Sequence, residues 1–133
     1  MPEQTRTALE AETERLLKLL DAMEFDALGA MLTDDIQSVD EITRGWIRGR
    51  AAIDAYLEQL RNTVSDLHSQ ARDLHVSNWE ETGIVTFVLE QTYKLDGAQQ
   101  TLEAPTSIVF RRHHDEWRIA LLHTVPLAPE TNP

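Results

Sequence analysis

The first half of the chain places hydrophobic and polar residues at helical intervals. Apolar residues recur every three or four positions up to Met23, and Thr7 followed by Glu10 has the spacing of a capping box. This pattern predicts a first helix that ends near Met23. A second, short helix is predicted to begin at Asp26, a good N-cap residue, and to end by Thr33–Asp35.

A third helix is predicted over Arg50–Arg61, because its apolar residues share one helical face. Two shorter features precede it. Ile36–Asp40 alternates briefly between apolar and polar residues, and Glu41–Gly49 contains two glycines, which predicts a loop.

The second half of the chain has the alternation of β-strands. The four predicted strands are Asp66–Trp79, Ile84–Leu95, Thr101–His113 and Trp117–Val125. The connections between them are short enough for antiparallel hairpins. Helices followed by a strand meander predict an α+β fold, in which three N-terminal helices pack on a strongly curved antiparallel sheet and the open end forms a pocket.

The length, the composition and the charge of the chain exclude several classes of function. The chain has 133 residues, so we expect a single domain over 1–133 with its core at about 8–126 and a flexible tail at 127–133. It has no cysteine, which excludes disulfides, thiolate metal sites and cysteine nucleophiles. The net charge of −11 argues against nucleic acid and anionic membranes as partners. The N-terminus lacks the pattern of a signal peptide, and we expect a cytoplasmic protein.

Several motifs together resemble a known family. They are Glu24–Leu28, Leu32–Ile36 with Val39-Asp40, Arg48–Ile53, Ser107–Arg112, Glu116–Ile119 and Leu122–Thr124. In this order they resemble the nuclear transport factor 2-like superfamily, and the last three resemble its SnoaL-like branch. The resemblance covers about Leu9 to Pro126. It implies a cone-shaped α+β barrel of cystatin-like topology with a cavity, and a homodimer formed through the outer face of the sheet.

The resemblance does not decide the reaction, because this fold serves both enzymes and binding modules. It implies a protein that binds a small apolar or cyclic organic molecule without a cofactor. Three functions fit: an enzyme of isomerase, cyclase or hydratase type that uses a carboxylate in the pocket as its base; a ligand-binding protein without catalysis; and a dimeric assembly module whose cavity is filled by aromatic side chains.

Asp40 is the first candidate catalytic residue. It matches the position at which ketosteroid isomerase-like members carry the carboxylate that removes a proton, and a carboxylate in a cavity wall can act as a base. The alternative is that Asp40 caps a turn. Those isomerases also use a tyrosine on the first helix and a second carboxylic acid. Here the first helix has no tyrosine, and Ser107 or a neighbour stands at the position of the second acid.

His123 is the second candidate. It alternates with Trp117, Ile119 and Leu121 on one face of the last strand, while Thr124 belongs to the other face. If the first face lines the pocket, His123 is a general acid or base that can pair with Asp40. If the second face does, Thr124 lines the pocket and His123 lies on the outer sheet. A β-bulge would exchange the two faces without a mark in the sequence.

Four more residues are candidates for ligand binding. On the strand Ile84–Leu95, the larger and more aromatic face predicts that Gln91 and Tyr93 point inward, to orient a ligand or to form hydrogen bonds in the core. Trp46 precedes the third helix and is either a lid or an aromatic plug of the core. Tyr56 on that helix has the same two interpretations, and its hydroxyl can donate to a ligand.

The five histidines do not predict a metal site. A zinc or iron site needs about three converging ligands. His68 and His75 are seven residues apart, which would put them on opposite faces of an unbroken strand, and His113 and His114 are neighbours that point in opposite directions. The sequence therefore predicts a site without a metal or other cofactor.

Overall fold

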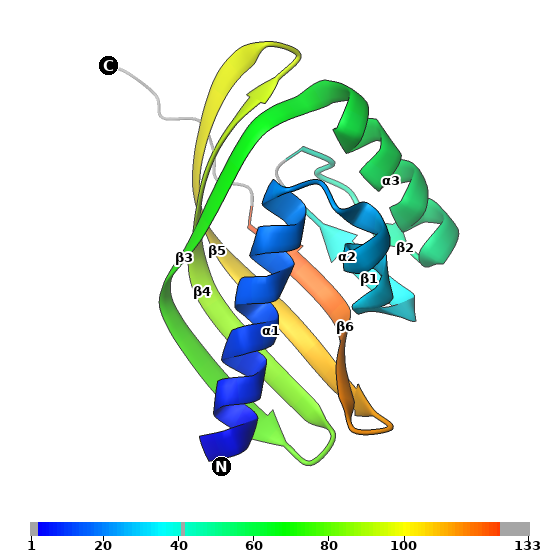
Figure 1. Ribbon diagram of the computed structural model, residues 1–133, viewed down its shortest axis with the longest axis vertical. Helices are drawn as coiled ribbons and strands as arrows, with labels where there is room; N and C mark the ends of the chain where they lie inside the picture. Colours follow the sequence, from blue (N-terminus) through cyan, green and yellow to red (C-terminus); the bar gives the residue numbers. More distant parts are fainter. Residues whose placement is uncertain (1–2, 41, 126–133) are drawn as a thin grey trace.

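The computed structural model describes residues 3–40 and 42–125, arranged as helices packed on one sheet (Figure 1). The helices of this part are α1 (Glu3–Asp21), α2 (Phe25–Ala30) and α3 (Arg50–Thr63). The strands are β1 (Leu32–Val39), β2 (Ile47–Arg48), β3 (Val64–Trp79), β4 (Thr82–Leu95), β5 (Ala98–His113) and β6 (Glu116–Thr124). The predicted tail at 127–133 lies outside the described residues.

The strands form one sheet in the order β2-β1-β6-β5-β4-β3. β3 to β6 are joined by antiparallel hairpins, as predicted, whereas β1 pairs with β6 in parallel. The sheet curves strongly around the helices without closing into a barrel (Figure 1). The α+β fold with N-terminal helices on a curved sheet is therefore confirmed.

The curvature of β3 has a local cause. Its register against β4 shifts between Ser65 and His68 and again between Arg72 and His75, and each interval contains an aspartate with positive φ, Asp66 at 51° and Asp73 at 56°. Aspartate tolerates this left-handed conformation better than most residues, and an extra residue of this kind bends a strand. The two β-bulges thus curl the sheet over the helices.

The bulge at Asp73 also corrects the expectation for two histidines. His68 pairs with Thr92 and His75 pairs with Thr86, and these two threonines share the outer face of β4. Both histidines therefore lie on the same face of the sheet, because the strand is interrupted and its alternation does not hold across the bulge.

The second helix is shorter than predicted. It ends at Ala30, and Leu32 already pairs with Ile119 in β6. The guanidinium of Arg50 donates hydrogen bonds to the carbonyl oxygens of Gly29 (2.6 Å) and Leu32 (3.0 Å), so tertiary contacts replace the next helical turn. The first helix, in turn, begins at Glu3, so the predicted capping box lies inside it.

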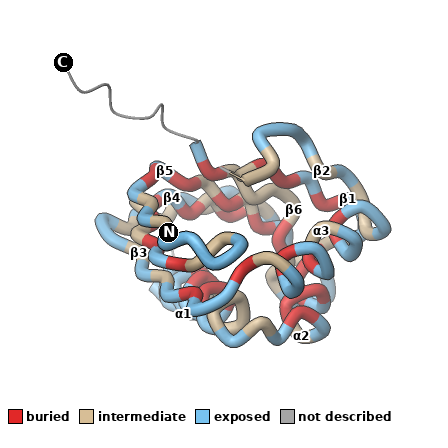
Figure 2. The backbone as a smooth tube through the Cα atoms, turned by 90° about the horizontal axis from the view of Figure 1, so that it is seen from above, coloured by how far each residue is buried: buried red, intermediate tan, exposed pale blue. Residues whose placement is uncertain are grey.

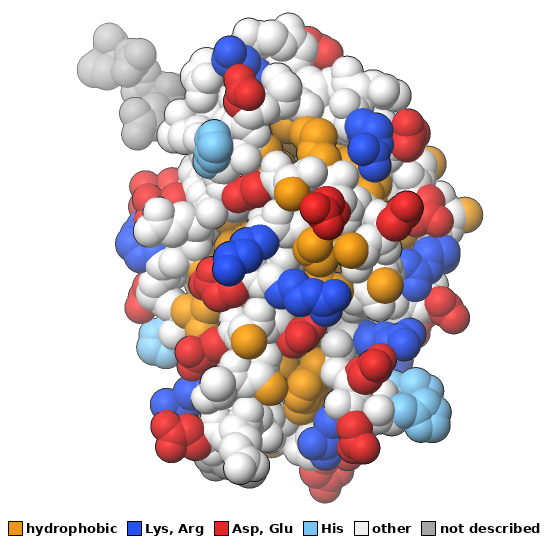
Figure 3. Space-filling view, viewed as in Figure 1, with side chains coloured by type: hydrophobic (Ala, Val, Ile, Leu, Met, Phe, Trp, Pro, Cys, Tyr) orange, Lys and Arg blue, Asp and Glu red, His pale blue; other side chains and the backbone are white. Residues whose placement is uncertain are grey.

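The core lies between the helices and the concave face of the sheet (Figure 2). Leu9 and Leu16 of α1 pack there with Phe110 and Ile119 of the sheet, each at most 2% exposed. The opposite surface of the helices carries acidic and basic side chains side by side (Figure 3). Within residues 3–40 and 42–125, no helix combines the length and the apolar character that crossing a membrane requires.

Candidate functional site

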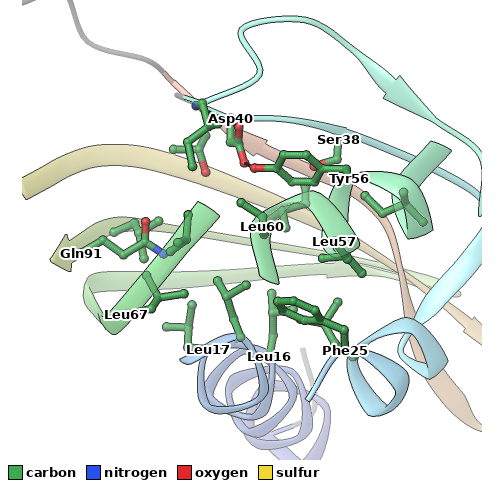
Figure 4. A pocket seen from close by; sticks show the side chains of 18 of the residues that line it. Leu16, Leu17, Phe25, Ser38, Asp40, Tyr56, Leu57, Leu60, Leu67 and Gln91 are labelled. Atoms are coloured by element: carbon green, nitrogen blue, oxygen red, sulfur yellow. Dashed lines mark hydrogen bonds between the residues drawn. The ribbon is translucent and has the colours of Figure 1, made fainter. Parts of the chain in front are cut away.

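A cavity lies between the helices and the concave face of the sheet. The cavity volume is about 100 Å³, whereas holding one water molecule takes roughly 10–15 Å³. Most of its wall is apolar and comes from all three helices and from β1, β3, β4 and β6. In Figure 4, Leu16, Leu17 and Phe25 line one side of the cavity, and Asp40 and Tyr56 lie across from them.

Several of the polar lining residues lie where β1, β5 and β6 meet α3. Ser38 and Asp40 come from the end of β1 and the residue after it, Thr106 from β5 and Thr124 from β6. Thr106 Oγ1 lies 3.3 Å from Thr124 Oγ1 and 3.2 Å from the Ala104 carbonyl oxygen, to which it donates. A few convergent polar groups on an apolar wall are typical of a site for a small organic ligand.

The carboxylate of Asp40 is held by the turn that follows β1. Its Oδ1 accepts hydrogen bonds from the backbone N–H groups of Ile42 (3.0 Å) and Thr43 (2.9 Å) and from Thr43 Oγ1 (3.1 Å). Thr43 Oγ1 in turn accepts a hydrogen bond from the Asp40 backbone N–H at 3.2 Å. The residue therefore caps a turn, as the alternative interpretation expected, and it also lines the cavity.

The second oxygen of Asp40 points to Tyr56. The Tyr56 hydroxyl donates a hydrogen bond to Asp40 Oδ2 (Figure 4). α3 aims the phenol there because Ile53, Leu57 and Leu60 bury the neighbouring positions of the helix against the core. The two residues are 16 positions apart in the sequence, and their side chains meet at one wall of the cavity.

β4 supplies two further predicted residues. Gln91 and Tyr93 are 7% and 5% exposed, and both line the cavity together with Phe87 and Leu89. The larger and more aromatic face of this strand thus points inward, as its alternation indicated. Gln91 Nε2 donates a hydrogen bond of 3.0 Å to Ser69 Oγ on β3.

A bulge in β6 decides which of its residues face the cavity. The register against β5 shifts between Ile119 and Leu121, so Ile119 faces the core before the shift and Leu122 and Thr124 face the cavity after it. His123 pairs with Ser107 on the other face of the sheet. Neither of these two is among the described residues that line the cavity, so no pairing of His123 with Asp40 forms.

Trp46 also lies outside the cavity. It is 49% exposed, its ring stacks on His123 with centroids 5.9 Å apart, and the guanidinium of Arg48 lies 5.2 Å above it. Trp46 is not among the described residues that line the cavity.

Within the described ranges, no three His, Asp or Glu side chains gather closely enough to bind a metal ion. The resolved pKa shifts lie away from the cavity, at the turn between β3 and β4. There the bidentate hydrogen bonds from Arg112 lower the pKa of Glu81, and Glu81 raises the pKa of Arg112.

Three residues of the site were missed from the sequence. Ser38 shares the alternation of Ile36–Asp40, which is a signal that could have found it. Thr106 is the inward-facing neighbour of the predicted Ser107. Thr43 has no such signal, because its contact with Asp40 depends on the conformation of an irregular turn.

Comparisons with known proteins support the fold. Three solved structures of similar fold are provisionally named as an aromatic ring hydroxylase from Novosphingobium aromaticivorans, a dehydratase of the NTF2-like family from Streptomyces avermitilis and a scytalone dehydratase from Novosphingobium aromaticivorans. Their identities to the chain are 18%, 16% and 13%, with TM-scores of 0.87, 0.87 and 0.80. The matches cover 97%, 97% and 95% of this chain and 93%, 100% and 89% of the others. At these identities the likeness shows the fold alone.

A search of curated proteins found no match. The family model of the SnoaL-like domain, by contrast, matches residues 9–128, almost the whole chain. The match includes every element that forms the cavity except the first turns of α1. The chain therefore belongs to the SnoaL-like domain family.

Proposed function

We propose that the protein binds a small, mainly apolar ring compound in the cavity and catalyses a proton transfer of the isomerase, cyclase or hydratase type. Asp40 is the base, and Tyr56 is the hydrogen-bond donor beside it. One observation carries the proposal: a carboxylate and a phenol hydroxyl meet in the wall of a cavity that is otherwise mostly apolar.

The two oxygens of Asp40 have different hydrogen-bond partners and therefore different proposed roles. Oδ1 is occupied by three donors from Ile42 and Thr43, whereas Oδ2 faces Tyr56. In the proposed step, Oδ2 removes a proton from a carbon next to a carbonyl group. The C–H bond breaks, an O–H bond forms on Asp40, and the electron pair moves onto the carbonyl oxygen as an enolate.

Tyr56 supports the charge that develops. As Asp40 becomes neutral, the Tyr56 hydrogen is released from Oδ2 and can be donated to the enolate oxygen. The enolate then collapses in one of two ways: Asp40 returns the proton to another carbon, which is an isomerisation, or the enolate expels a hydroxyl group from the β-carbon, which Asp40 protonates to water. Dehydratase names among proteins of this fold support including the second outcome.

Exchange of hydrogen for deuterium tests the proposal without knowledge of the natural substrate. Small cyclic ketones are incubated with the protein in D₂O, and loss of the α-proton signal is followed by NMR. We expect exchange above the buffer rate and a drop of at least roughly 100-fold in Asp40→Asn. Asp54→Asn is the matched control, because Asp54 is exposed on the same helix as Tyr56. Equal exchange by Asp40→Asn and the unmodified protein would refute Asp40 as the base.

We further propose a homodimer through the outer face of the sheet. Val88, Val109 and Leu121 are half-buried side chains on this face, and the exposed Trp46 lies against it through His123. An isologous contact between two copies would cover these groups. Light scattering after gel filtration should give about twice 15.2 kDa, and a mass of one chain would contradict the dimer.

A further inference from the structure

Gln91 is a buried polar residue that the proposed proton transfer does not use. It lies on the inward face of β4 and is 7% exposed. Figure 4 shows its side chain entering the cavity from a different wall than Asp40 and Tyr56. Burying an amide in an apolar wall is unfavourable unless its groups form hydrogen bonds. The question is therefore which partner the NH2 group and the carbonyl oxygen of this amide each have.

Only one end of the amide forms a hydrogen bond to another described residue. Gln91 Nε2 donates to Ser69 Oγ at 3.0 Å. Among residues 3–40 and 42–125, no hydrogen bond is formed to the carbonyl oxygen Oε1, which is not one of the fully buried atoms without a partner. Oε1 is an acceptor with two lone pairs, and the residue that carries it lines the cavity.

The orientation of the amide is fixed by two further elements. Ser69 is paired directly with Gln91 across β3 and β4, and its backbone N–H donates a hydrogen bond of 2.8 Å to Asp21 Oδ2 at the end of α1. A chain of hydrogen bonds thus runs from α1 through β3 to Gln91. It keeps Nε2 engaged and leaves Oε1 as the free acceptor.

We propose that Gln91 selects ligands that carry a hydroxyl or N–H donor away from the atom on which Asp40 acts. This inference rests on the proposed function and names its substrate class: a ring ketone with a distal donor group. The donor bonds Gln91 Oε1, while the carbonyl and the adjacent C–H group lie at Asp40 and Tyr56. A ligand without the donor leaves Oε1 without a partner in an apolar wall.

Three related ketones test the selection. They are α-tetralone, its derivative with a hydroxyl group on the aromatic ring para to the ring carbon that is bonded to the carbonyl group, and the methyl ether of that derivative. Calorimetry gives their dissociation constants. We expect the hydroxylated ketone to bind roughly tenfold more tightly than the other two, which is the effect of one added hydrogen bond. In Gln91→Leu we expect the three affinities to become equal.

A second variant, Ser69→Ala, releases the amide without changing a lining residue, and we expect it to reduce the preference as well. Equal binding of all three ketones by the unmodified protein, or an unchanged preference in Gln91→Leu, would overturn the role of Gln91. Either result would leave the proposed proton transfer standing, because that is measured by deuterium exchange in Asp40→Asn. A tighter complex with the methyl ether would assign the opposite orientation to the amide and also overturn the inference.

Discussion

Asp40 combines a structural role and a proposed chemical role, and two substitutions separate them. Replacing Asp40 with alanine removes the acceptor of three hydrogen bonds in the turn after β1 and the partner of the Tyr56 hydroxyl. Replacing it with asparagine keeps a carbonyl oxygen that can accept the three bonds of the turn. It removes the charge and the basicity, and it puts an amide NH2 group in place of Oδ2, which donates to the Tyr56 oxygen instead of accepting from it.

The magnitude follows from these contacts. Loss of an aspartate that caps backbone N–H groups costs about 1 kcal/mol, and loss of the bond from Tyr56 adds about 1 kcal/mol. Both groups are only partly buried, so water replaces part of what is lost. We expect Asp40→Ala to lower the free energy of unfolding by about 2 kcal/mol, and Asp40→Asn by less than about 0.5 kcal/mol.

Urea denaturation followed by circular dichroism measures both values, and deuterium exchange is measured on the same samples. The account predicts that Asp40→Asn keeps the stability and loses the exchange, whereas Asp40→Ala loses both. Equal destabilisation by the two substitutions would refute the reasoning, since the turn would then depend on the charge of the carboxylate rather than on its oxygen as an acceptor.

Four further predictions concern single contacts. Tyr56→Phe should slow deuterium exchange roughly 100-fold while ketone affinity stays within about twofold; an unchanged rate would remove Tyr56 from the chemistry. Thr43→Val should slow exchange less than Asp40→Asn, because Thr43 only positions the carboxylate; equal losses in both would contradict this. Ile119→Val should lower the free energy of unfolding by about 1 kcal/mol in urea, and no loss would mean that the side chain is not tightly packed. Because Arg112 lowers the pKa of Glu81, their pair stabilises the fold above pH 4.5 and is lost as the pH falls through the lowered pKa. The difference in melting temperature between the unmodified protein and Glu81→Gln should therefore shrink below pH 4.5, and a constant difference would contradict the pair.

The fold was predictable because its signals are long and periodic. The four long strands and the third helix each extend over several repeats of their pattern, and short connections then determine the hairpins. The end of the second helix was not predictable, because the hydrogen bonds from Arg50 that accompany it come from a residue far along the chain.

Some residues of the site could likewise be placed from the sequence, and others could not. Gln91 and Tyr93 could be placed inward because β4 alternates without interruption through both. His123 could not be placed, because the bulge between Ile119 and Leu121 leaves no mark in the sequence. The contact between Asp40 and Tyr56 depends on how α3 packs over the end of β1, which local patterns do not encode.

The most direct test of the central claim is a crystal structure of the protein soaked with α-tetralone. The account predicts that the ketone occupies the cavity, with its α-carbon within about 3.5 Å of Asp40 Oδ2 and its carbonyl oxygen beside the Tyr56 hydroxyl. A ketone bound in the cavity with its α-carbon turned away from Asp40, or bound only outside the cavity, would contradict the account.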